Sequence, residues 1–182
     1  MLFFFILQGP DRIDRETAER FARLYDDLFP KVFRYVNYRI VDRHVAEDLT
    51  SRTFEKALTK FHRFSADKAS FSTWVFSIAR NTLIDHFRQA GHNPKDVDDP
   101  VLEVSGDASS PEATAMRNEE RRELLTYVSR LSGQEQELLS LKFGSGLSNR
   151  EIAAIKGLGE SNVGVILYRS VRKLRDLLAA HA

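Results

Sequence analysis

Hydrophobic residues recur at intervals of three and four along most of the chain, which is the spacing of one buried helix face. The helices that this pattern predicts span residues 15–29, 32–41, 44–61, 71–90, 116–131 and 134–144. Ser70 is expected to cap the fourth of these helices, and Ser132 and Glu135 are expected to form a capping box at the start of the sixth. Pro30 is expected to end or kink the first helix, because proline lacks the N–H that an interior position needs. No stretch of convincing length alternates apolar and polar residues as a strand does. The sequence therefore predicts an all-α fold.

Two further helical patterns meet near the end of the chain, between residues 147 and 178. Ser148 and Glu151 form a capping box that begins the first helix, and Gly157 suits a left-handed helix end. A tight turn leads to the second helix, which is expected to start at Gly159 and to bury an apolar stripe that includes Val171. This pattern is typical of a helix-turn-helix, whose second helix contacts bases near its N-terminus and phosphates through its basic C-terminal part. An ordinary antiparallel helix pair shows the same pattern, so the residues alone leave both interpretations open.

Composition and charge divide the 182 residues into parts. Residues 91–119 carry seven acidic and two basic side chains, and three of the five prolines lie between 91 and 114. Residues 91–114 are therefore predicted to be an acidic, flexible linker between two small basic domains. The predicted organisation is an N-terminal tail (1–14), an N-terminal helical bundle (15–90), the linker, and a four-helix domain containing the helix-turn-helix (115–182).

The composition also narrows location and chemistry. There is no cysteine, which excludes disulfides and thiolate metal sites and is most simply explained by a cytoplasmic protein. The apolar start of the tail lacks a basic segment before it and a cleavage site after it, and it is too short to span a bilayer. Membrane insertion is therefore not expected.

Candidate catalytic chemistry is sparse. His44 and Asp48 are four residues apart on one predicted helix, and Asp85 adjoins His86. Neither pair has a third ligand or a nucleophile within sequence reach. We therefore expect a protein that is not an enzyme and has no metal site or cofactor.

Three runs of residues point to one family. Residues 46–64 and 71–89 resemble the conserved domain of bacterial extracytoplasmic-function (ECF) sigma factors of the sigma-70 family, and residues 131–178 resemble their C-terminal domain. The resemblance implies a promoter-specificity subunit that binds the RNA polymerase core and promoter DNA, helps to open the minus-10 element, and is itself bound by an anti-sigma factor. The alternative is a dimeric helix-turn-helix regulator that binds operator DNA without core polymerase.

The same resemblance assigns candidate residues to each partner. The predicted core-polymerase contacts are Asp48, Thr50, Arg52, Thr53 and Phe54, of which Phe54 fits a core position equally well. Those predicted for the minus-10 element are Lys68, Asn81, Asp85, Arg88 and Gln89. Those predicted for the minus-35 element are Arg150, Ser161, Asn162, Gly164, Val165, Tyr168, Arg169, Arg172 and Lys173.

The predicted minus-35 helix departs from the family pattern at two glycines. Gly159 replaces the usual serine cap, which weakens the cap by a few tenths of a kcal/mol. Gly164 lies inside the helix, where glycine costs about 1 kcal/mol relative to alanine. The resemblance therefore predicts the individual DNA contacts of this helix less well than those of the other predicted sites.

Overall fold

The structure is a computed structural model, and it describes residues 15–40, 42–90, 124 and 126–180. Every regular element that these residues form is a helix, as the periodicity predicts. The predicted tail (1–14) and linker (91–114) lie outside the described residues. No helix in the described part of the chain combines the length and apolar character that a membrane span requires.

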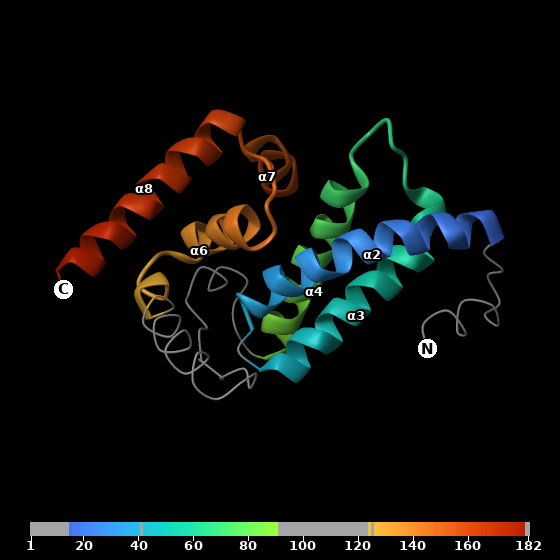
Figure 1. The fold of residues 1–182 in the computed structure, drawn as a ribbon, viewed down its shortest axis with the longest axis horizontal. Coiled ribbons are helices and arrows are strands. Elements are labelled where there is room, and N and C mark those ends of the chain that lie inside the picture. The colour runs from blue at the N-terminus through green and yellow to red at the C-terminus, as the bar shows by residue number, and fades with distance from the viewer. Residues whose placement is uncertain (1–14, 41, 91–123, 125, 181–182) are drawn as a thin grey trace.

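Three long helices form the first group, which we call the N-terminal bundle: α2 (Arg15–Asn37), α3 (Arg43–Thr59) and α4 (Phe71–Gln89). Figure 1 shows them side by side, with a short 3-10 helix, η1 (Phe61–Arg63), after α3. Asp42 caps α3 by accepting hydrogen bonds from the backbone N–H groups of His44 and Val45, at 2.8 and 3.3 Å. Ser70 caps α4 as predicted, accepting from the N–H of Thr73 at 3.1 Å.

Pro30 does not end the first helix, because α2 continues through it to Asn37. Loss of one backbone hydrogen bond at an interior proline typically costs about 3 kcal/mol. The apolar residues on both sides of Pro30, including Phe21 and Val36, are buried in the same core. Burial of this continuous apolar stripe offsets the lost hydrogen bond. The prediction that Pro30 ends the helix considered only the proline itself and not this burial.

The second group, which we call the C-terminal unit, consists of α6 (Gly133–Leu139), the π-helical turn η3 (Ser140–Gly144), α7 (Asn149–Lys156) and α8 (Glu160–Ala179). Ser132 and Glu135 form the capping box predicted at the start of α6. The residue with left-handed backbone after η3 is Gly146, with φ 72°.

The N-terminal bundle and the C-terminal unit pack against each other. α4 contacts α7, and α2 contacts η3. Gly144 lies directly under the ring of Tyr38, where an added Cβ would come within 2.9 Å of the ring. Buried residues of both groups belong to one continuous apolar cluster.

Candidate nucleic-acid interface

Two helices and the turn between them form the predicted helix-turn-helix. The Ser148 side chain accepts from the N–H of Glu151 at 3.2 Å, while the Glu151 carboxylate accepts from the N–H of Ser148 at 2.9 Å. Gly157 ends α7 with φ 66°, the left-handed conformation expected at this position. Gly159 precedes α8 without a side-chain cap hydrogen bond. The local geometry of the motif is therefore the one that its sequence predicts.

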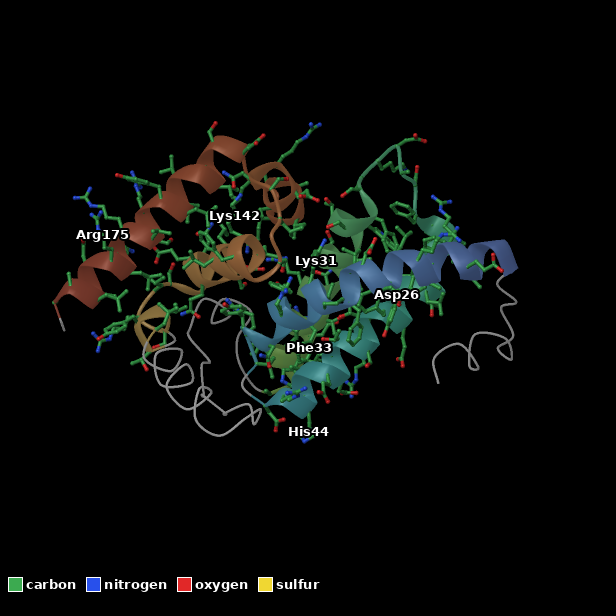
Figure 2. All side chains as sticks on the ribbon, in the orientation of Figure 1. Asp26, Lys31, Phe33, His44, Lys142 and Arg175 are labelled. Atoms are coloured by element: carbon green, nitrogen blue, oxygen red, sulfur yellow. The ribbon has the colours of Figure 1, made fainter. Side chains whose placement is uncertain are left out.

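The outward face of α8 combines cations with apolar side chains. Tyr168 is 69% exposed, and Val165 and Val171 are each 45% exposed. Arg175 also lies on the outer side of α8 (Figure 2). Most residues predicted to contact the minus-35 element are exposed: Arg150, Ser161, Asn162, Val165, Tyr168, Arg169, Arg172 and Lys173. The structure therefore brings these side chains onto an accessible surface.

Two of the residues predicted to contact the minus-35 element, Gly164 and Lys173, lie close to other residues of the C-terminal unit. Gly164 is only partly exposed, and a Cβ there would lie 3.5 Å from Nδ2 of Asn149, an ordinary contact distance. Lys173 donates to Oε1 of Glu135 at 2.7 Å. Burial would raise the pKa of Glu135, but the hydrogen bonds from Lys173 and Ser132 hold that pKa below its ordinary value. A phosphate would have to compete with this carboxylate for Lys173.

The predicted minus-10 surface lies on α4 and on the loop before it. Lys68, Asn81, Arg88 and Gln89 are exposed, and Asp85 is half-buried. The Asp85 carboxylate lies 3.5 Å from Nζ of Lys56 and 3.9 Å from Nη1 of Arg88. Lys56 also donates to Oγ1 of Thr82 at 3.3 Å. These cations balance a carboxylate that would otherwise repel DNA, a role for Lys56 that sequence reasoning missed because α3 and α4 are separate in the chain.

The aromatic residues near this surface pack mainly on one another. Phe71 and Phe76 are buried, and Trp74 is half-buried, with its ring centroid 5.3 Å from that of Phe64 and 5.6 Å from that of Phe71. The Phe76 ring contacts Tyr35 in an edge-to-face arrangement. Core packing therefore accounts for Phe71 and Phe76, while Phe64 and Trp74 keep part of their rings accessible beside the 64–70 loop.

The residues predicted to contact the polymerase core divide into two sets. Asp48 and Arg52 are exposed and form an ion pair, with 2.8 Å between Oδ2 and Nη2. Thr50, Thr53 and Phe54 are each 0% exposed, and both threonine hydroxyls donate to carbonyls of their own helix. In this structure the three buried side chains shape the bundle from inside. Direct contact with a partner is open only to Asp48 and Arg52.

His44 and Asp48, the candidate pair on α3, each lie beside a different residue. The His44 side chain is 94% exposed, with 3.9 Å between its Nδ1 and Oε2 of Glu47, while Asp48 pairs with Arg52. No group of three or more potential metal ligands occurs among the described residues. Figure 2 shows His44 at the start of α3, on the outside of the bundle.

Comparison with known proteins identifies two family regions in this chain. Residues 24–93 match Sigma-70 region 2, and residues 121–174 match Sigma-70, region 4. An all-helical chain that carries both regions is a sigma factor of the sigma-70 class. The ECF RNA polymerase sigma factor SigC of Mycobacterium tuberculosis is 35% identical over 153 residues, which cover 83% of this chain and 77% of SigC. The chain belongs to the ECF sigma factors.

A second relative and one solved structure are also similar to this chain. The ECF RNA polymerase sigma factor BldN of Streptomyces coelicolor is 36% identical over 168 residues, covering 92% of this chain and 64% of BldN. The solved structure of CnrH, in complex with the cytosolic domain of CnrY, superposes with a TM-score of 0.68 at 20% identity. That match covers 91% of each chain and supports the fold.

Proposed function

We propose that this chain is a dissociable promoter-specificity subunit of bacterial RNA polymerase. The observation that carries the proposal is the presence, in one chain, of an exposed α4 surface and an exposed helix-turn-helix within the two matched sigma-70 regions. The N-terminal domain (15–90) binds the core enzyme and the minus-10 element, and the C-terminal domain (115–182) binds the minus-35 element. Phosphodiester synthesis belongs to the polymerase, so no catalytic step is assigned to this chain.

The contacts follow from the exposed chemistry. Asn81 and Gln89 present amides that can hydrogen-bond base edges, while Arg88 and Lys68 bind phosphates beside them. On α8, Asn162 and Val165 lie at the end that enters a major groove, and Arg169 and Arg172 follow toward the phosphates. Asp48 and Arg52 supply the charged contact with the core enzyme. The site of action is the cytoplasm, where the polymerase works.

An anti-sigma factor is a further proposed partner. The solved structure of CnrH contains CnrH in complex with the cytosolic domain of CnrY. By analogy, a regulatory protein is expected to bind this chain and prevent it from joining the core enzyme.

The test is run-off transcription with purified core polymerase and a promoter that the chain selects from random sequence. We expect transcripts only when chain, core and promoter are all present. The charge reversals Asp48→Arg and Arg52→Asp should each weaken core binding, and the double variant should restore much of it if the partner tolerates the inverted pair. Glu55→Arg, an exposed change on the same helix, is the matched control.

The same experiment decides against the regulator alternative. A dimeric regulator would bind duplex DNA tightly without core and would give no promoter-dependent transcript. Failure of core binding at low salt would reject the function proposed for this chain.

A further inference from the structure

The side chain of Glu137 connects the C-terminal unit to the N-terminal bundle. Its Oε1 lies 2.9 Å from Nε of Arg80 on α4, and its Oε2 contacts Nζ of Lys156 on α7. The Glu137 side chain is only 7% exposed. Burial would raise its pKa, but the Lys156, Arg80 and Arg39 cations hold that pKa below the ordinary value. The carboxylate therefore stays charged at neutral pH within an otherwise covered contact.

Other polar contacts cross the same boundary. Nε of Arg34 donates to the carbonyl of Gly144 at 3.0 Å, and Nη1 of Arg39 donates to the carbonyl of Gly133 at 3.2 Å. The buried Tyr35 also faces Glu137, and burial together with this neighbouring carboxylate raises the pKa of the Tyr35 hydroxyl. Three arginines of the N-terminal bundle thus meet the C-terminal unit: Arg34 on α2, Arg39 in the turn after α2, and Arg80 on α4. Their partners there are one carboxylate and two backbone carbonyls.

Lys156 allows the N-terminal bundle to leave Glu137 without leaving this carboxylate unpaired. It belongs to the same unit as Glu137, so it remains paired with the carboxylate when the bundle moves away. A buried charge left alone carries a large penalty, whereas a charge that keeps one partner does not. Arg80, already 30% exposed, would gain water or another anion. The charges at the boundary therefore favour closure without making opening prohibitive.

Arg80 also adjoins the proposed DNA surface. It immediately precedes Asn81, which is exposed on α4. Neighbouring residues of an α-helix project about 100° apart, so the Arg80 side chain, which is 30% exposed, lies beside the helix face of Asn81. While Glu137 holds it, this guanidinium is occupied by an internal anion; a DNA phosphate presents the same charge and acceptor chemistry.

We propose that Glu137 acts as an electrostatic latch. In the free protein its carboxylate holds the C-terminal unit against the N-terminal bundle and occupies Arg80, and separation of the two parts on the promoter releases Arg80 to the DNA backbone. The closure itself is a property of the free chain. The release to DNA rests on the function proposed above.

The first arm of the test measures closure without polymerase or DNA. The chain has no native cysteine, so cysteines introduced at the exposed Lys60 and Asp176 would label α3 and α8 specifically. We expect Glu137→Gln and Arg80→Gln to raise the open-to-closed ratio in single-molecule energy transfer by about tenfold, as loss of a charged hydrogen bond predicts. Glu135→Gln is the matched control, because glutamine preserves a capping box and Glu135 pairs only within the C-terminal unit among the contacts described.

The second arm measures transcription with saturating core polymerase. Glu137→Gln should increase single-round transcripts several-fold, because opening is easier and Arg80 remains. Arg80→Gln should decrease them several-fold, although it opens the free protein equally. Loss of stability alone would not make the two variants change transcription in opposite directions. Thermal melts followed by circular dichroism would measure the stability of each variant separately.

Each result decides one part of the proposal. Unchanged distances in both Glu137→Gln and Arg80→Gln would overturn the latch, whatever the chain does in transcription. Equal transcription effects of the two variants would overturn the release of Arg80 to DNA. If the unsubstituted chain gives no promoter-dependent transcript, the proposed function fails while the distance measurements still test closure. If Glu137→Gln does not fold, Arg80→Gln alone decides the first arm.

Discussion

The surfaces of α4 and α8 that we propose to contact promoter DNA differ in how their charges are balanced. On α4, Asp85 lies between Lys56 and Arg88, so the surface carries an internal acid with its own cations. On α8, no described acidic side chain pairs with Arg169 or Arg172 within 4.0 Å. A balanced surface favours hydrogen bonds to bases in a melted strand, whereas unpaired cations favour the phosphates of a duplex. The two surfaces should therefore respond differently to salt and to base substitution.

The largest expected effect is on the α4 surface. Asn81→Ala should reduce transcription about 5-fold to 100-fold at the preferred promoter, the range expected for loss of a bidentate base contact. The reduction should disappear on promoters altered at the one base pair that Asn81 contacts, which a panel of single substitutions in the minus-10 element would reveal. Equal losses on every promoter in the panel would mean that Asn81 does not discriminate bases.

A comparable test on α8 should show a salt effect instead. Replacing Arg169 and Arg172 together with alanine should weaken promoter binding by a similar factor on all sequences. It should also reduce the slope of log K against log salt by about 2, close to one unit per lost phosphate contact. Arg175→Ala is the control, because that guanidinium already lies 3.8 Å from Asp176. A sequence-dependent loss with an unchanged slope would reverse our assignment of the two surfaces.

A smaller effect should come from the glycine within α8. Gly164 has no left-handed backbone, and a Cβ there would make only ordinary contact with Asn149. Gly164→Ala should therefore stabilise the C-terminal unit by about 1 kcal/mol, which a thermal melt would show as a rise of a few degrees. An unchanged or lowered melting temperature would show that the Asn149 amide does not accommodate the methyl group.

The smallest effect concerns pH. The pKa values of Glu135 and Glu137 are both lowered from 4.5. Their carboxylates therefore stabilise the fold at and above that pH, and the contribution is lost as the pH falls through the lowered values. The double variant Glu135→Gln, Glu137→Gln should be less stable at neutral pH and should show a flatter acid-side stability curve. A curve parallel to that of the unsubstituted chain would contradict the pairings described for Lys173, Lys156 and Arg80.

The helix-capping signals in the sequence were reliable. The capping boxes at Ser132 and Ser148, the Ser70 cap and the left-handed Gly157 all match their predictions. Each depends on a hydrogen bond or backbone angle within a few residues, so a short stretch of sequence contains all the information. The all-helical class follows from the same periodicity.

Properties that depend on distant segments were not predictable in this way. Thr50 and Thr53, which the family resemblance assigns to the core-polymerase contact, are buried, and their hydroxyls donate to carbonyls of their own helix. On α8 the periodicity assigned Val171 to the buried face, yet Val171 is 45% exposed and Ser170 is buried, with its hydroxyl donating to Ile166. The pairing of Arg80 with Glu137 joins residues 57 positions apart. Only the packed structure shows such pairs.

The close approach of Gly144 to Tyr38 brings the π-helical turn against an aromatic ring in the turn that follows α2. Because an added Cβ would lie 2.9 and 3.2 Å from two ring carbons, the π-turn can approach α2 only to the depth of one aromatic ring. A methyl group at this position would act as a wedge, displacing the ring or tilting the C-terminal unit. Shape therefore limits how closely the two halves of the molecule approach at this point, and this limit does not depend on ionic strength.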